Sequence, residues 1–278
     1  MIGSNEIFDS NKHDAPVVSK GIIASLSQKN ASLSIFPFLS EQHPGALDYV
    51  KDIISRNIVD GLFIWFNKPD NEEVCRYLHR IRFPFVYLST HYSPYTLNLP
   101  AEYPVAAIEE LQILRNNLKK YQASGIRQVI LLASIDDYQN DRTHQLLLKV
   151  CGEIGMEYHD RNMQGFSFRQ IEESLNRNST RDTLFITSNR LADRVCDAVS
   201  SHETRCGEFN LLLFRHYSPD WSQWKGKFRI FDRPFEQLGR QAASLMLDLI
   251  HRRECGLTPC NGQRICLNAF ISETDEYA

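Results

Sequence analysis

Short apolar segments of strand length alternate with longer amphipathic segments along almost the whole of this 278-residue chain. A short apolar run bounded by turn residues is typical of a strand that is buried on both faces of a parallel sheet. Repeated alternation of strand and helix favours doubly wound α/β layers, in which right-handed crossovers join the parallel strands. The expected strands are Ala31–Phe38, Gly61–Phe66, Pro84–Ser89, Gln128–Ser134, Glu157–Met163, Asp182–Ser188, Phe209–Arg215, Phe228–Asp232 and Arg264–Ile271.

Apolar residues recur at helical spacing between these strands. In Ala46–Arg56, for example, Val50, Ile53 and Ile54 fall on one face of a helix. A chain of this length is long enough to form two lobes, each with its own core. Further helices are expected at Tyr103–Ala123, Thr143–Ile154, Phe168–Asn176 and Leu191–Ser200.

Composition excludes several classes of protein. The net charge is −3, and no segment is rich in Lys and Arg, so the chain presents no nucleic-acid surface of its own. The longest apolar runs, such as Gly61–Phe66, are far too short to cross a bilayer, and we expect no membrane partner. The first residues also lack the basic and apolar regions of a signal peptide.

Seven cysteines are present, an odd number, and none forms a CxxC pair. Scattered free thiols are typical of a reducing compartment, so a cytoplasmic location is expected. The spacing of Cys255, Cys260 and Cys266 matches no common zinc pattern, and we expect no metal and no cofactor. The chain also lacks a nucleophile elbow, a P-loop, an HExxH helix and a dinucleotide fingerprint, so no catalytic residue is assigned.

The segment Phe231–Ile250 is the most informative part of the sequence. A strand ends at Asp232, and Pro234 follows near the first turn of a helix, where its fixed φ and missing N–H cost little. Apolar residues then recur at helical spacing at Leu238, Ala242, Leu245 and Leu249.

This strand, turn and Pro-x-x-x-Leu-Gly helix resembles the return crossover of the lac-repressor/gal-repressor (LacI/GalR) family. Other elements resemble the family's motifs in the same order, from a first core strand at Ile2-Gly3 to the Arg-Pro of the crossover. These elements are Phe83–Ser89, Gly125–Ile130, Arg142, Gly165–Ser167, Ser188–Ala192 and Arg233-Pro234.

The resemblance implies two doubly wound parallel-sheet lobes with a ligand cleft between them, as in type I periplasmic binding proteins. The N-terminal lobe would comprise residues 1–104 and 234–257, and the C-terminal lobe residues 105–233 and 258–278. It implies the effector-sensing and dimerisation core of a transcriptional regulator without its helix-turn-helix head. The implied partners are a sugar-like small molecule, a second copy of the chain, and DNA bound through the missing head.

Ligands of open α/β sheets bind beyond the carboxyl ends of the strands. The residues that follow or end the strands, read together with the family motifs, are therefore the candidate ligand contacts. They are Trp65, Ser89, Arg142, Phe166, Asn189, Arg215, His216 and Asp232.

Several of these residues have a second interpretation. Arg142 either contacts the ligand or pairs with one of the neighbouring aspartates. Trp65 and Phe166 either stack on the apolar face of a sugar or pack in the core. His216 either titrates near the ligand or lies on the surface, and Asn189 also suits the N-cap of the following helix.

Four positions depart from the family pattern. His216 stands at the place of an aspartate, Ser89 at a position that is often aspartate, Asn189 in place of the Asp of Asn-Asp, and Gln145 in place of a glycine. These changes remove carboxylates from the expected cleft. The ligand is therefore either different from a common hexose or itself negatively charged.

Two other classes of function share this scaffold. A free solute-binding protein of a transport system has the same lobes and cleft, and its monomeric state would distinguish it from a dimeric regulator. An enzyme on an α/β scaffold is the third class, since fold alone does not determine function.

Overall fold

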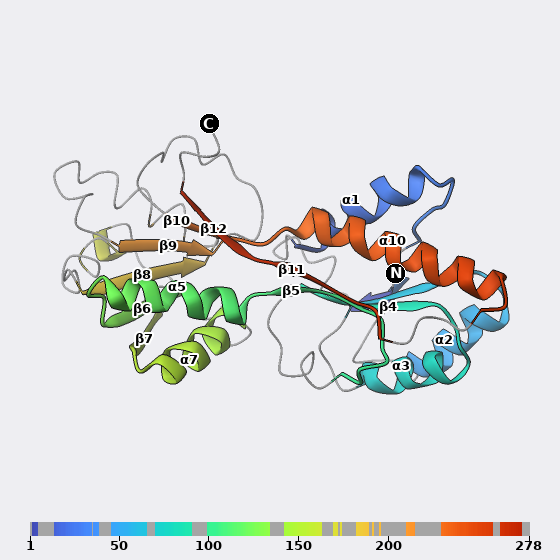
Figure 1. The fold of residues 1–278 in the computed structure, drawn as a ribbon, viewed down its shortest axis with the longest axis horizontal. Coiled ribbons are helices and arrows are strands. Elements are labelled where there is room, and N and C mark those ends of the chain that lie inside the picture. The colour runs from blue at the N-terminus through green and yellow to red at the C-terminus, as the bar shows by residue number, and fades with distance from the viewer. Residues whose placement is uncertain are drawn as a thin grey trace. The chain divides into compact units, whose positions relative to one another are not determined.

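The computed structural model describes residues 2–4, 14–34, 36–38, 46–65, 70–90, 99–133, 142–162, 169–171, 173, 182–188, 191, 195, 210–214, 229–257 and 262–273. The chain divides into two compact units (Figure 1). Unit 1 comprises Met1–Ile108 and Pro234–Leu267, and unit 2 comprises Glu109–Arg233 and Asn268–Ala278. The chain therefore passes three times from one unit to the other.

Unit 1 is built on a six-stranded sheet with the order β11-β5-β4-β3-β1-β2. β1 pairs in parallel with β2 and β3, and parallel pairing continues from β3 to β4 and from β4 to β5. All side chains of β3 and β4 are buried, as expected for strands that are covered on both faces. The strands are β1 (Ile2–Ser4), β2 (Phe36–Phe38), β3 (Leu62–Trp65), β4 (Phe85–Ser89), β5 (Val105–Glu109) and β11 (Arg264–Asn268).

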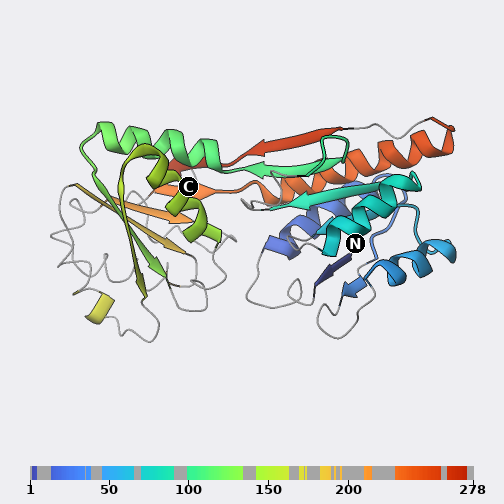
Figure 2. The same ribbon diagram turned by 90° about the horizontal axis from the view of Figure 1, so that it is seen from below.

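Helices cover both faces of this sheet. Helices α2 (Ala46–Ser55) and α3 (Asp70–Arg80) cover one face, where Val50 and Leu78 join a core cluster with Leu62 and Ile64. Helices α1 (Asp14–Ser27) and α10 (Phe235–Glu254) lie side by side on the other face (Figures 1 and 2). Gly61, on that face, lies directly against the side chain of Met246 in α10.

The α1–α10 contact is so close that the two backbones touch. A Cβ atom at Gly239 of α10 would lie 2.1 Å from the carbonyl oxygen of Val18, and one at Gly21 of α1 would lie 2.1 Å from that of Glu236. Glycine is therefore required at both positions by the neighbouring helix and not by its own backbone angles.

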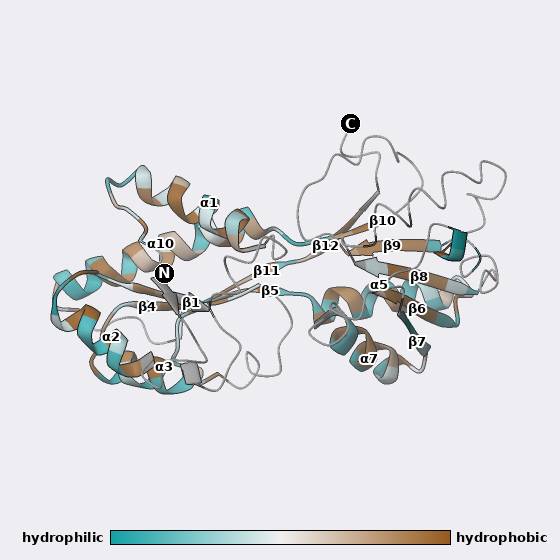
Figure 3. Ribbon diagram, turned by 180° about the vertical axis from the view of Figure 1, so that it is seen from behind, coloured by the Kyte–Doolittle hydropathy of each residue, from teal (hydrophilic) through white to brown (hydrophobic). Residues whose placement is uncertain are grey.

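Unit 2 has a second six-stranded sheet, with the order β12-β10-β9-β8-β6-β7. The strands pair in parallel except β12, which is antiparallel to β10. β9 is apolar over most of its length (Figure 3), and four of its five residues are buried. The strands are β6 (Gln128–Ala133), β7 (Glu157–Asn162), β8 (Thr183–Ser188), β9 (Asn210–Phe214), β10 (Arg229–Asp232) and β12 (Phe270–Glu273).

Helices α5 (Leu111–Ala123) and α7 (Arg142–Ile154) pack against each other in unit 2. Arg115 of α5 and Glu153 of α7 form a bridge between them, with Arg115 Nε donating to Glu153 Oε2 at 2.8 Å. Leu114 and Leu118 of α5, together with Leu147 of α7, are completely buried.

The expected single helix Tyr103–Ala123 was wrong. Val105–Glu109 is strand β5, and the helix begins only at Leu111. The apolar residues of Val105–Ile108 fit helical spacing, but pairing of β5 with β4 buries all four of them in the first sheet. A short apolar run does not distinguish strand from helix by its period alone.

The expected last strand Arg264–Ile271 is also corrected, because this segment forms two strands in two sheets. β11 belongs to unit 1 and β12 to unit 2, with buried Ala269 between them. The divisions between units accordingly fall after Ile108 and after Leu267, whereas residues 104 and 257 were expected. Both boundaries lie later in the chain than expected because β5 and β11 extend the first sheet.

Within the described residues, no helix combines the length and the apolar character that a bilayer-spanning helix needs.

Candidate functional site

Both sheets reverse their strand order at one point. In unit 1, β2 lies on one side of β1 and β3 on the other, and in unit 2, β7 and β8 flank β6 in the same way. Ligands of open α/β sheets bind outside the carboxyl ends of the strands at such a point. The carboxyl edges of the two sheets, near β1–β3 and near β6–β8, are therefore the candidate ligand-binding edges.

Trp65 lies at the reversal point of unit 1. It is the last residue of β3 and is in register with Gly3 of β1. Because side chains alternate along a strand, Trp65 shares the face of Phe63 and lies opposite Leu62 and Ile64. Its side chain is only 7% exposed, which favours packing on the face that carries α1 and α10.

Ser89 ends the neighbouring strand β4 and is in register with Ala107 of β5. Ser89 and the following Thr90 are both buried, at 2% and 1% exposure. Two buried hydroxyl groups thus stand at the carboxyl end of a strand whose other side chains are apolar or aromatic. Hydroxyl groups both donate and accept hydrogen bonds, so this edge carries neutral polar groups.

In unit 2, Asp232 is the last residue of β10 and is half-buried. Its Oδ1 accepts a hydrogen bond of 2.8 Å from the backbone N–H of Arg233. This bond fixes the carboxylate against the chain as it leaves the sheet. Asp232 is a candidate acceptor for ligand hydroxyl groups at this edge.

The remaining candidates are placed only by the elements that precede them. Arg142 is the first residue of α7, the helix that follows β6, but its side chain is not among those described. Ser188 and Phe214, the last residues of β8 and β9, are in register with each other. The candidates that lie outside the described residues are Phe166, Asn189, Arg215 and His216.

The sequence analysis did not single out an ion pair that is buried in unit 2. Arg233 Nε donates to Glu110 Oε1, and both side chains are only 1% exposed. The Arg233 guanidinium carbon also lies 5.2 Å from the ring centre of Phe214 and 5.6 Å from that of Phe231. These rings stack at 4.6 Å, so the cation lies against the Glu110 carboxylate and against two aromatic faces.

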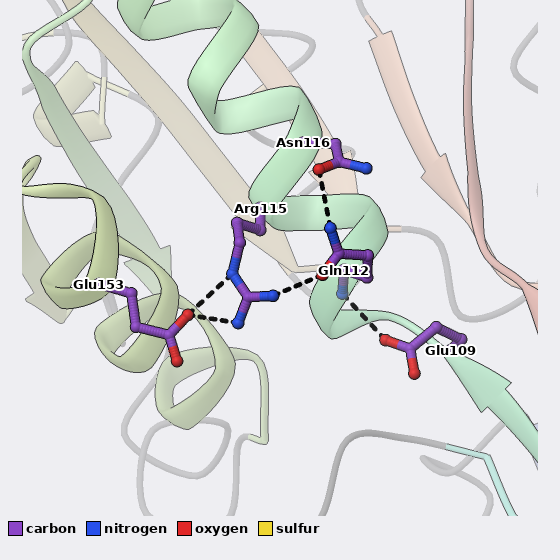
Figure 4. A network of polar contacts seen from close by, with 5 residues as sticks. All are labelled: Glu109, Gln112, Arg115, Asn116 and Glu153. Atoms are coloured by element: carbon purple, nitrogen blue, oxygen red, sulfur yellow. Dashed lines mark hydrogen bonds and ion pairs between the residues drawn. The ribbon is translucent and has the colours of Figure 1, made fainter.

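Beside this pair, a surface network ties the first turn of α5 to α7 (Figure 4). Glu109 Oε1 accepts the backbone N–H of Gln112 at 2.9 Å, which caps the start of α5. The Gln112 side chain in turn accepts from Arg115 at 2.5 Å, and Arg115 bonds Glu153. The adjacent residues Glu109 and Glu110 thus have different partners. Glu109 bonds Gln112 at the surface, and Glu110 pairs with Arg233 in the interior.

Four described cysteines fall into two classes. Burial raises the pKa of the Cys75 thiol to about 12, with a further contribution from Glu72, and burial alone raises that of Cys151 to about 12. Cys255 and Cys266 are exposed. No group of three metal-binding side chains occurs in the part of the chain that the structure describes.

The difference between the buried and the exposed cysteines predicts that a thiol reagent will label them selectively. At pH 8, a thiol with a pKa of about 12 is a thiolate in only about one molecule in 10⁴, and the thiolate is the reactive form. Peptide mass spectrometry after brief iodoacetamide treatment should find Cys255 and Cys266 alkylated and Cys75 and Cys151 intact. Urea should make all four react, and fast labelling of Cys151 in the native protein would contradict the packing of α7.

Comparisons with known proteins support a fold but no closer relationship. No family model matches the chain, and no curated protein matches it. Among solved structures, a LacI transcriptional regulator from Lactobacillus brevis has a TM-score of 0.68 at 15% identity, covering 98% of each chain. The lac repressor dimer bound to operator and the anti-inducer ONPF has a TM-score of 0.65 at 15% identity, covering 98% of this chain and 91% of that one.

A third neighbour is a LacI family transcriptional regulator from Enterococcus faecalis V583 with bound ribose. Its TM-score is 0.63 at 16% identity, and the match covers 98% of this chain and 96% of the other. The resemblance to LacI-type regulators is thus confirmed at the level of fold over nearly the whole chain. The expected fold class, two α/β units with parallel sheets, is confirmed as well.

Proposed function

We propose that this chain is the effector-sensing core of a LacI-type transcriptional regulator, which acts in the cytoplasm. The observation that carries the proposal is the match over 98% of the chain to a regulator that is itself covered over 98% of its length. A shared fold of this extent includes both sheets and both reversal points of strand order. Function does not follow from fold alone, so binding has to be tested directly.

The proposed effector is a sugar or sugar derivative. A ribose-bound regulator is among the neighbours of the same fold. Ser89 and Asp232 supply a hydroxyl and a carboxylate at the carboxyl ends of β4 and β10. Arg142 starts α7, where five fixed guanidinium donors would suit vicinal hydroxyl groups or an anionic substituent.

Effector binding would act by differential affinity for two conformations of the chain. Because the chain passes between the units at 108/109, 233/234 and 267/268, a ligand-driven change has to be accommodated in these three segments. In a full regulator, the change would alter the affinity of DNA-binding heads for their operator.

A thermal-unfolding screen tests the proposal. The panel contains D-ribose, hexoses, sugar acids, polyols, sugar phosphates and nucleobases. A ligand at a hundred times its Kd should stabilise the fold by about 2.7 kcal/mol, seen as a higher Tm. The Arg142→Ala variant should lose this shift, whereas Arg127→Ala should keep it, because Arg127 is exposed and precedes the amino end of β6. A panel without any shift would contradict a sugar sensor.

A regulator core of this kind is expected to form a homodimer. Sedimentation equilibrium at micromolar concentration should therefore give twice the chain mass. A monomer that still binds a sugar would favour the free solute-binding protein instead.

A further inference from the structure

The three connections between the units converge on one dipeptide, Glu109-Glu110, at the start of unit 2. We propose that this dipeptide is a clasp, which binds the unit 2 ends of all three connections so that they move as one element. The clasp consists of contacts within unit 2 and holds without any ligand. Its role in transmitting an effector signal rests on the proposed function.

The first contact binds the second connection. Glu110 is the second residue of unit 2, and Arg233 is the last residue before the chain returns to unit 1. Their buried ion pair joins positions that are 123 residues apart in sequence. Because both side chains are buried, separating them would break a charge-assisted contact in the interior, which is costly.

The second contact binds the third connection. The carbonyl oxygen of Glu109 accepts a 3.1 Å hydrogen bond from the N–H of Ala269. Ala269 is the second residue of the final segment of unit 2 and is 2% exposed. A buried backbone bond of this kind is shielded from competition by water.

The third contact anchors the dipeptide in the body of unit 2. The Glu110 carbonyl accepts the N–H of Leu114 at 2.8 Å, and the Glu109 carboxylate accepts the N–H of Gln112 at 2.9 Å (Figure 4). Through Arg115 and Glu153, the same turn is joined to α7. The clasp is therefore continuous with the α5–α7 pair.

The clasp also reaches a candidate ligand-binding edge. The Arg233 guanidinium faces the rings of Phe214 and Phe231, at the ends of β9 and β10. Phe214 immediately precedes Arg215, and Arg233 donates its backbone N–H to Asp232. A ligand held at these strand ends would thus act on Arg233, the residue whose pair with Glu110 joins the first two connections.

Native-state amide exchange, followed by NMR without ligand, tests the clasp in the unaltered chain. The amides of Leu114, Arg233 and Ala269 should open together, with the same dependence on denaturant, as members of one cooperative unit. Opening of Ala269 at a lower denaturant concentration than the other two amides would overturn the proposal.

Substitution provides the second test. In Glu110→Gln, exchange of the Ala269 amide should become at least about tenfold faster, although Glu110 does not bond Ala269. The control is Val150→Ala, which opens a cavity at a buried position of α7, a helix that contains none of the three connections. Exchange in the two variants is compared under conditions that give them the same Tm. A difference in Ala269 exchange then does not reflect a difference in global stability. Equal Ala269 exchange in both variants would overturn the clasp, whereas failure of the sugar screen would overturn only the proposed function.

Discussion

Replacement of Arg233 by methionine should lower the free energy of unfolding of unit 2 by about 3–5 kcal/mol. The change removes the Arg233 cation from beside the Glu110 carboxylate, at a place where both side chains are only 1% exposed. Methionine keeps most of the side-chain volume, so the loss would reflect the broken ion pair and not a large cavity. Urea unfolding of the purified variant, followed by circular dichroism, measures the change.

The double variant Glu110→Leu/Arg233→Met separates charge from packing. An apolar pair of similar volume should recover most of the stability, because a buried ion pair is often no more stabilising than well-packed apolar residues. The difference between the double variant and the two single variants gives the coupling energy. As a control, Arg169→Met should change stability by less than about 1 kcal/mol, since the Arg169–Glu173 pair is exposed at 85% and 46%. A loss from Arg233→Met as small as this would contradict the burial of the pair.

Gly239→Ala should lower the free energy of unfolding of unit 1 by about 1–3 kcal/mol, even though alanine is the better helix former. The added methyl group would lie 2.1 Å from the carbonyl oxygen of Val18, so α1 and α10 would have to separate. A backbone carbonyl cannot rotate away as a flexible side chain can. Thermal unfolding of the variant should show a lower Tm.

Gly152→Ala is the matched control, and we expect it to change the free energy of unfolding in the opposite direction. Gly152 lies in α7, is exposed and has no atom within 4 Å of an added Cβ. Gly152→Ala should therefore stabilise unit 2 by about 0.4–1 kcal/mol. A stabilising Gly239→Ala would show that the two helices of unit 1 are not in backbone contact.

Much of the fold could be predicted from local pattern. The strands β3, β4 and β6 appear as short apolar runs because both of their faces are buried. The amphipathic α2 was also expected, with an end that differs by a single residue. Helices α1 and α3 were not predicted. α3 is rich in charged residues, whereas the buried residues Val18, Ile22 and Leu26 of α1 do recur at helical spacing and were overlooked.

The candidate site was predictable only where it follows strand ends. Ser89 and Asp232 are the last residues of their strands, as expected, whereas Trp65, which was expected inside the strand Gly61–Phe66, is the last residue of β3. Glu110 was missed because it lay inside the expected helix Tyr103–Ala123 and not at the end of a strand. No local pattern could pair it with Arg233, since the two residues lie 123 positions apart.

The measurement that tests the sensor most directly is amide exchange with and without a saturating sugar from the thermal screen. Binding should slow exchange after the carboxyl ends of the strands, around residues 65–66, 89–90, 188–189 or 232–233. Amides at the amino ends of the same strands should not change. Protection at the amino ends, without protection at the carboxyl ends, would contradict an effector held at the carboxyl edge of a sheet.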